Sequence, residues 1–278
     1  MAKSPLRKSR KNILTKKTIS RSHSKSEQLV WGIHPVLEAL QACPQAIRDI
    51  NVEKGKTGLR LEQILELAQE NSIPVTMVSS KNKAGARKID ELPEHEKSQG
   101  ISARIDLPTL TLEGLLDKLK DVSGPPLLLA LDSIQDPHNL GAIIRSAVAA
   151  GVNGLILPKD RSAPLTGTVI KISAGSAFHI NICKVTNLVS SFKLLKKNGI
   201  WIFGTTKDAS QPVYDADLTV PACLVIGSEG KGLRPLVAEQ CDLHISIPMQ
   251  SSLDSLNASV AAGIILFEIV RQRRASPS

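Results

Sequence analysis

The segment ACLVIGSEGKGLRP, residues 222–235, joins an apolar run to a glycine-rich loop. The run from Ala222 to Ile226 contains no charged or amide side chain, which is typical of a strand buried on both faces. Three glycines then fall within six residues, and Glu229 and Lys231 stand between them. A strand that leads into such a tight loop predicts an α/β fold with a ligand site at the carboxyl end of the strand.

The loop GSEGKG, residues 227–232, fits neither of the two common phosphate-binding templates. A Walker A loop needs Ser or Thr after its lysine, whereas Gly232 follows Lys231. The dinucleotide-binding fingerprint needs the closer pair of glycines first, and here the spacing is reversed. The carboxylate of Glu229 would also repel a polyphosphate. The loop is either an ordinary strand-to-helix turn or a place where backbone groups approach a less anionic ligand.

Apolar runs alternate with helical patterns over residues 127–278. The runs predict strands at residues 127–131, 154–158, 179–183, 200–204, 223–227 and 243–248. Helical patterns lie between most of them and after the last, at residues 139–150, 187–197, 232–240 and 257–271. This alternation predicts an α/β architecture in which helices cover a parallel sheet.

Residues 27–105 predict a second, smaller α/β unit. Apolar side chains share one face of a helix at 61–70, and the runs at 74–79 and 100–105 predict strands beside it. Residues 106–126 are expected to form a linker with a short amphipathic helix, which ends in SGPP.

The excess positive charge lies in the first 26 residues. Residues 1–25 contain nine basic and no acidic residues, whereas the rest of the chain contains 26 of each. Because this tail has few apolar residues, we expect it to be disordered. Three roles stay open for it: an electrostatic arm for RNA or DNA phosphates, an inert solvated tail, or an organellar targeting segment.

The spacing of the cysteines and the lengths of the apolar stretches indicate in which cellular compartment the protein is expected. The four cysteines, at positions 43, 183, 223 and 241, form no C-x-x-C pair, which indicates a reducing compartment and no metal framework. No apolar stretch reaches the roughly 18 residues that a membrane span requires. We therefore expect a cytoplasmic protein that binds neither metal nor membrane, with organellar targeting as the less favoured alternative.

Two further stretches place polar residues on or near helix starts. In DSIQDPHNLGAIIRSAVAAG, residues 132–151, Asn139 is expected to cap a helix from which Arg145 projects. In the stretch after residue 244, Asn257 begins the last helix, where free N–H groups favour a carboxylate. Taken alone, Arg145 would be a surface ion-pair partner and Asn257 a simple cap.

Together, three segments resemble, in order and spacing, the motifs of the SpoU-type (TrmH-like) RNA 2′-O-methyltransferases. They are DPHNLGAIIRSA (136–147), VIGSEGKGL (225–233) and IPMQSSLDSLNASVA (247–261). The resemblance covers residues 127–273. VWGIHPVLEAL (30–40) and HEKSQGISARI (95–105) resemble the two ends of the small L30e-like RNA-binding domain of the bacterial RlmB-type branch, which methylates a guanosine ribose in 23S rRNA. The third motif departs from the family, because it has no glycine soon after IPM and adds Asp254.

The resemblance implies a fold and a cofactor. The fold is a parallel sheet with a C-terminal deep trefoil knot (SPOUT type), preceded by an L30e-like domain at residues 27–105. The cofactor is S-adenosylmethionine, which would be held by the loops of the knot. The implied cofactor-binding residues are Gly204, Thr205, Ile226, Gly227, Gly230, Ile247, Met249 and Leu256.

The implied reaction is methyl transfer to a ribose 2′-oxygen in RNA by a homodimer, without a metal. The implied catalytic residues are Arg145, Asn139, Glu229, Ser255 and Asn257. Arg145 would act as a base or as a phosphate anchor, and we favour the anchor because a guanidinium stays protonated in water. The substrate is expected to be 23S rRNA. A tRNA methyltransferase and a non-catalytic RNA-binding or ribosome-assembly protein are the alternatives.

Overall fold

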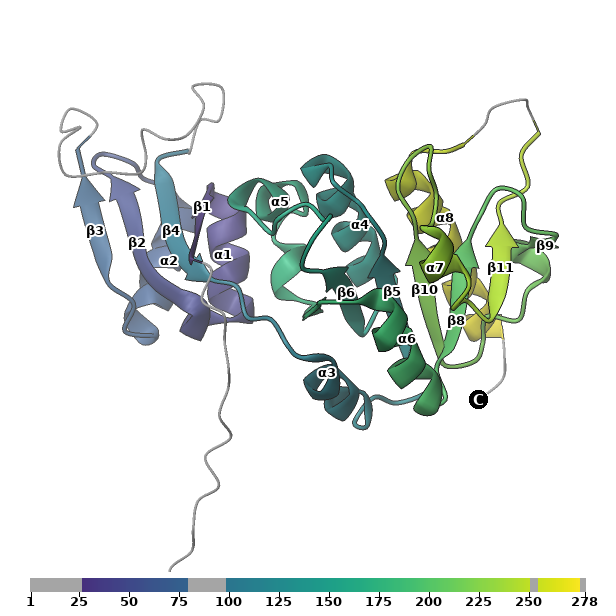
Figure 1. The fold of residues 1–278 in the computed structure, drawn as a ribbon. Coiled ribbons are helices and arrows are strands. Elements are labelled where there is room, and N and C mark those ends of the chain that lie inside the picture. Colours follow the sequence, from purple (N-terminus) through teal and green to yellow (C-terminus); the bar gives the residue numbers. More distant parts are fainter. Residues whose placement is uncertain (1–26, 80–98, 251–254, 276–278) are drawn as a thin grey trace, which may run out of the picture.

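The computed structural model describes residues 27–79, 99–250 and 255–275 (Figure 1). The predicted disorder of the basic tail, residues 1–26, lies outside these ranges, and so do four residues of the third motif, 251–254. Within the described ranges, no helix has the length and apolar content that a membrane crossing requires.

The N-terminal part contains a four-stranded mixed sheet in the order β1-β4-β2-β3. Its strands are β1 (Glu27–Trp31), β2 (Ile47–Glu53), β3 (Val75–Val78) and β4 (Ile101–Asp106), and its helices are α1 (Ile33–Ala42) and α2 (Leu59–Glu70). The pair β2–β3 is parallel and the pairs formed by β4 are antiparallel. The sequence pattern predicted α2, β3 and β4 within about two residues, which is the usual error at element ends.

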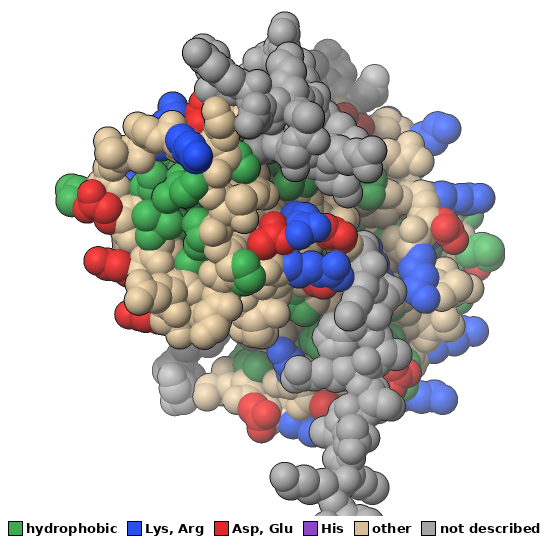
Figure 2. All heavy atoms as spheres, turned by 90° about the vertical axis from the view of Figure 1, so that its left-hand side faces the viewer, with side chains coloured by type: hydrophobic (Ala, Val, Ile, Leu, Met, Phe, Trp, Pro, Cys, Tyr) green, Lys and Arg blue, Asp and Glu red, His purple; other side chains and the backbone are tan. Residues whose placement is uncertain are grey.

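The arginines on this sheet are paired with carboxylates of the sheet. Arg48 pairs with Asp106 at 2.8 Å and with Glu27 at 3.6 Å, and Arg104 pairs with Asp49 and with Glu27. Figure 2 shows acidic and basic side chains interspersed on the described surface at this end of the molecule. The strands carry two arginines and four carboxylates, Glu27, Asp49, Glu53 and Asp106, so this sheet is formally acidic and not basic.

The larger part is built on a parallel sheet in the order β7-β6-β5-β10-β8-β11-β9. The strands are β5 (Leu127–Leu131), β6 (Gly154–Pro158), β7 (Asn181–Val185), β8 (Trp201–Thr205), β9 (Gln211–Pro212), β10 (Ala222–Ile226) and β11 (Leu243–Ser246). Every residue of β5, β6 and β10 is buried, because helices cover both faces. The predicted parallel α/β sheet is confirmed.

Alternate residues of the strands belong to two separate cores. Leu129 and Leu131 pack in one core with helices α4 (Pro137–Ala149), α5 (Gly167–Ile172) and α8 (Ala258–Ala275). Leu128 and Ala130 pack in the other with α3 (Leu112–Leu119), α6 (Leu188–Lys197) and α7 (Pro235–Ala238). Helix α3, which the sequence placed in a linker, is therefore packed on this sheet.

The sequence-based prediction did not include β1, β2, α1 and the two-residue β9, and three further elements differ from it. The strand expected at 179–183 lies at 181–185, and the short helix α5 was not predicted. The helix expected at 232–240 is reduced to the four residues of α7, because Gly232 adopts a left-handed φ of 63° and the helix begins only at Pro235.

The two parts of the chain are packed tightly where α5 meets β1. A Cβ at Gly167 would lie 2.0 Å from the carbonyl oxygen of Leu29 and 2.3 Å from the ring of Trp31, so only glycine fits there. The Lys171 ammonium lies 5.8 Å from the Trp31 ring centroid, within cation–π range. The N-terminal sheet is thereby held against the larger part.

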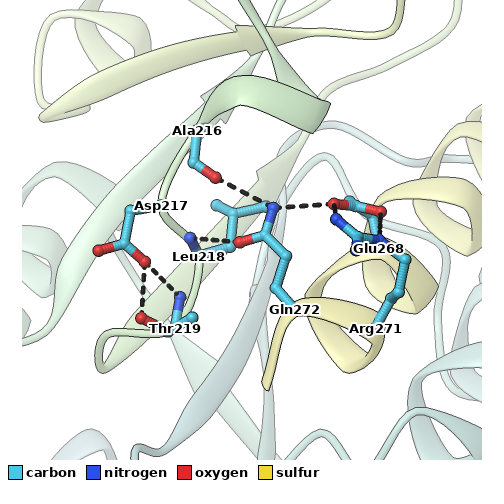
Figure 3. A network of polar contacts seen from close by, with 7 residues as sticks. All are labelled: Ala216, Asp217, Leu218, Thr219, Glu268, Arg271 and Gln272. Atoms are coloured by element: carbon cyan, nitrogen blue, oxygen red, sulfur yellow. Dashed lines mark hydrogen bonds and ion pairs between the residues drawn. The ribbon is translucent and has the colours of Figure 1, made fainter. Parts of the chain in front are cut away.

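Side chains of helix α8 bind the backbone of the loop at residues 216–218 (Figure 3). The Gln272 side-chain amide donates to the carbonyl of Ala216 at 3.0 Å and accepts from the N–H of Leu218 at 2.9 Å. It also donates to Glu268, whose pKa is held below its ordinary value by hydrogen bonds from Arg271. Gln272 thus provides partners for the backbone groups of Ala216 and Leu218, which are both buried.

Arg273 adds a second attachment one residue later. Its guanidinium donates to the carbonyls of Pro125, Pro126, Leu218 and Val220. Burial lowers the pKa of Arg273 from its ordinary value. The last turns of α8 are thereby bound to the segment just before β5 and to the segment before β10.

The Gln272→Ala variant is expected to unfold about 2 kcal/mol more easily, because the buried Leu218 N–H and the Ala216 carbonyl lose their partner. Urea denaturation would measure this loss. Arg274→Ala, which removes an exposed side chain from the same turn, is the control and should change stability little. Equal stability of the two variants would contradict the anchoring role of Gln272.

Candidate active site at the carboxyl edge of the sheet

The segments after β8, β10 and β11 enclose a pocket of about 370 Å³ at the carboxyl edge of the sheet. Seven of the eight residues expected to bind the cofactor line it: Thr205, Ile226, Gly227, Gly230, Ile247, Met249 and Leu256. Gly204 is not among the lining residues. A Cβ there would lie 2.6 Å from Sγ of Cys241, so this glycine permits close packing behind the pocket.

The glycine-rich loop is a small closed turn. The N–H groups of Ser228 and Gly232 donate to each other's carbonyl oxygens at 3.1 and 2.9 Å. A Cβ at Gly227 would lie 2.3 Å from the backbone of Gly232, and Gly230 has a left-handed φ of 74°. Because these amides are bonded within the turn, they are not available to cradle a phosphate, as the glycine spacing predicted.

The carboxylate of Glu229 joins the three sequence motifs. Its Oε1 accepts from Nδ2 of Asn139 at 3.0 Å, from the N–H of Ala258 at 3.2 Å and from Nδ2 of Asn257. Asn257 Nδ2 also donates to Oδ1 of Asn139 at 2.9 Å. Since Ala258 is the first residue of α8, the negative charge lies at the positive end of that helix. The carboxylate in the glycine-rich loop thus binds protein groups beside the pocket. We call Asn139, Glu229 and Asn257 the carboxylate–amide cluster.

Asn257 has two functions within this cluster. Its Oδ1 accepts from the N–H of Ser259 at 2.9 Å and so caps α8, while its Nδ2 faces Glu229.

The expectation that Asn139 caps its own helix is wrong. Asp136 is the cap of α4 and accepts from the N–H of His138 at 2.8 Å, which leaves the Asn139 side chain, 8% exposed, free to join the cluster.

The other two expected catalytic residues lie apart from the cluster. Ser255 is exposed and lines the pocket. Arg145 lies six residues beyond Asn139 on α4, roughly 9 Å along the helix axis. Its side chain is exposed and, within the described ranges, forms no ion pair or hydrogen bond, so the surface ion pair considered from the sequence is absent there. The guanidinium is free to bind a group from outside the chain.

A buried ion pair that the sequence analysis missed supports the loop from behind. Asp132, fully buried at the end of β5, accepts from Nε of Arg234 at 2.6 Å and from the backbone N–H of Arg234 at 2.8 Å. The hydroxyl of Ser133 donates to the same carboxylate at 3.2 Å. Arg234 ends the loop that carries Glu229, so Asp132 fixes where this loop returns to the protein. An acidic residue directly after a wholly apolar strand was the available signal.

Among the described residues, no group of three or more His, Cys, Asp or Glu side chains is arranged to hold a metal ion. The pocket is lined by backbone groups, apolar side chains, hydroxyl side chains and two pairs of opposite charges: Asp208 and Glu229 with Lys207 and Lys231. A parallel α/β sheet with such a pocket at its carboxyl edge defines a protein that binds a small organic ligand.

The chain belongs to the SpoU rRNA methylase family, which matches residues 126–267. Residues 29–110 match the family described as RNA 2′-O ribose methyltransferase substrate binding. The resemblance seen in the sequence is thereby confirmed. Both matches together span the two sheets of the structure.

Individual relatives agree with the family. The chain is 42% identical over 246 residues to the 23S rRNA (guanosine-2′-O-)-methyltransferase RlmB of Pseudomonas putida, covering 88% of this chain and 96% of that protein. Its fold is similar to the SpoU methyltransferase AviRb of Streptomyces viridochromogenes in complex with AdoMet, with a TM-score of 0.75, 27% identity, and coverage of 90% and 92%. The TrmH/SpoU tRNA modifying enzyme of A. aeolicus matches 59% of this chain and 85% of its own, at 35% identity and a TM-score of 0.50.

Proposed function

We propose that this chain transfers the methyl group of S-adenosylmethionine to the ribose 2′-oxygen of a guanosine in 23S rRNA. The observation that carries the proposal is the convergence of three family motifs on the Glu229 carboxylate beside a pocket. The 23S rRNA guanosine substrate is the one named for the RlmB relatives, which match both parts of the chain.

The pocket suits S-adenosylmethionine better than it suits a nucleotide polyphosphate. Ile226, Ile247 and Leu256 provide apolar surface for an adenine ring. Asp208 and Glu229 line the same pocket together with Lys207 and Lys231, so its formal charge is balanced; a carboxylate there can face a sulfonium cation and a lysine the carboxylate of the same cofactor. When bound, S-adenosylmethionine supplies an electrophilic methyl group. We propose that the expected set, from Thr205 to Leu256, holds it in place.

The protein must then orient a ribose hydroxyl and stabilise charge as its proton leaves. We assign this role to Arg145, whose free guanidinium can bind a phosphate next to the ribose and stabilise the developing oxyanion. Asn139, Glu229 and Asn257 form the rigid wall against which the nucleotide is placed, and Ser255 contacts it from the pocket rim. The rigidity follows from the hydrogen bonds of the cluster.

We propose that two copies of the chain form the active unit. Val260 and Phe267, seven residues apart on α8, are 49% and 51% exposed and lie on the same helix face. This apolar face belongs to the helix that begins at the carboxylate–amide cluster. We propose that a second copy covers this face and places its own Arg145 near this site.

We further propose that the chain forms a deep trefoil knot and that residues 27–105 are an L30e-like domain. Support for the knot is the path of the C-terminus. β10 lies between β5 and β8 while β11 lies beyond β8, yet the next helix, α8, returns to pack with α4.

We keep 106–126 as the connection to the domain at 127–278 and the tail 1–26 as a candidate RNA-binding arm. All four cysteines are free, consistent with the reducing cytoplasm that we propose as the location.

Two alternatives are less well supported. A tRNA substrate is named for the A. aeolicus protein, but that protein matches little more than the larger part of this chain. A non-catalytic RNA-binding role is opposed by the intact cluster, because the exposed Glu229 and Asn257 and the buried Asn139 stay joined beside the pocket, where they can contact a nucleotide.

Arg145→Ala is expected to lower kcat for methylation of a 23S rRNA transcript on the order of 100-fold, because the oxyanion loses its stabilising cation. Calorimetry should show unchanged affinity for S-adenosylmethionine, since Arg145 does not line the pocket. Lys193→Ala, which removes an exposed cation from α6, is the control. Wild-type protein that neither binds the cofactor nor labels rRNA would contradict the proposed function, and a fully active Arg145→Ala would contradict the role of Arg145.

A further inference from the structure

The loop between β6 and α5 (Figure 1), residues 159–166, follows the carboxyl end of β6, which runs parallel to β5 and β10, so it lies at the same sheet edge as the pocket. The N–H of Lys159 donates to the carbonyl of Val185 at 2.8 Å, and that of Ala163 donates to the carbonyl of Ile134 at 2.8 Å. The side chains of Ala163 and Leu165 are 5% and 4% exposed. The backbone of this loop is therefore fixed from both sides.

The fixed backbone presents an arginine in an uncommon conformation. Arg161 has a φ of 59°, in the left-handed region that side chains other than Gly, Asn and Asp rarely adopt. Its side chain is exposed, and in the described part of the chain it forms no ion pair or hydrogen bond. Glycine would adopt this left-handed conformation with less strain than arginine. The conformation of the loop therefore does not require an arginine at position 161.

The position of the loop links Arg161 to the site. Ile134, to which the loop is bonded, belongs to the segment that runs from Asp132 into α4 and delivers Asn139 to the carboxylate–amide cluster. In the sheet, β6 is followed by β5 and then β10, whose loop carries Glu229. Two strand spacings amount to about 10 Å, so an RNA strand at the pocket extends readily over this loop.

We propose that Arg161 binds a backbone phosphate of the RNA that flanks the methylated nucleotide, and so positions the strand across the sheet edge. The inference rests on the proposed function. A guanidinium fork matches the oxygens of a phosphate and carries no base preference there, so the contact fixes register and not sequence. Lys159, also exposed on this loop, adds charge to the same surface, and Asp160 between them leaves it net positive.

Three substitutions separate the charge from the backbone effect. Arg161→Gly and Arg161→Asn both suit a left-handed residue but lack the charge, whereas Arg161→Lys keeps the charge and loses the fork. For the full chain binding a 23S rRNA transcript, loss of one phosphate contact should reduce the slope of log K against log salt by about 0.7 to 0.9. We expect this reduction and a raised KM for RNA in the Gly and Asn variants, a partial effect in Lys, and an unchanged kcat at saturating RNA.

The control is Lys197→Asn, which removes an exposed cation at the end of α6, where the chain enters the opposite edge of the sheet. It should leave the salt slope and KM as in the wild type. A wild-type slope in Arg161→Gly, or an equal loss in Lys197→Asn, would overturn the proposal. So would a change confined to the dimerisation constant in sedimentation, which would assign Arg161 to a protein interface. Because wild-type methylation is measured in the same assay, failure of the proposed function is recognised separately.

Discussion

Glu229→Ala is expected to lower kcat/KM for rRNA methylation on the order of 100-fold, the size of effect seen when one fixed hydrogen-bonding group leaves an active site. The variant removes the common acceptor of Asn139, Asn257 and the Ala258 N–H. The two amides then lose the acceptor that they share and keep only their bond to each other and the Asn257 cap, and the start of α8 loses its negative charge. Methyl incorporation from labelled S-adenosylmethionine into the transcript measures the loss.

Two variants make this experiment selective. Glu239→Ala removes an exposed carboxylate just after α7 and should methylate like the wild type. Glu229→Gln keeps an oxygen acceptor without the charge, so its loss should be smaller than that of alanine. Full activity of Glu229→Ala would show that the cluster only closes the fold and has no part in placing the nucleotide.

Most strands of the larger sheet could be predicted, because a strand that is buried on both faces appears in the sequence as an uninterrupted apolar run. The runs that became β5, β6 and β10 consist of apolar residues alone, so their lengths could be counted from the sequence. The glycine order of the loop after β10 was equally informative, since it excluded a phosphate cradle that the observed Ser228–Gly232 pairing also excludes. A local sequence pattern predicts the structure well where a single requirement, such as burial on both faces or a left-handed backbone, determines which residue types can occur.

The partners of polar side chains were harder to predict. Asn139 was expected to cap α4 because asparagine is a good cap, yet Asp136 precedes a proline at the first helical position, which is the stronger local signal. Gln272 and Arg273 bind backbone groups more than 50 residues away, and Asp132 binds an arginine 102 residues away. Such contacts are set by the tertiary path of the chain, which no local pattern contains.

Asp132→Ala is expected to destabilise the protein by about 3 kcal/mol, at the lower end of the cost of breaking a buried ion pair. The lower end applies because the Arg234 side chain, 36% exposed, can return to water, while the carboxylate is fully buried. The variant should also bind S-adenosylmethionine more weakly, since the loop with Glu229 loses its attachment at Arg234. Urea denaturation and calorimetry measure the two effects.

Asp132 is fully buried whereas Arg234 is partly exposed, and this difference allows a sharper test of their ion pair. Arg234→Ala leaves the Asp132 carboxylate buried with only a backbone N–H and the Ser133 hydroxyl, so it should destabilise at least as much as Asp132→Ala. In Asp132→Ala/Arg234→Ala no unpaired charge remains buried. The double variant should therefore cost about 1 to 3 kcal/mol less than the two single variants together. Simple additivity would mean that the two side chains stabilise the loop independently, and the ion pair could not be what fixes the position of Glu229.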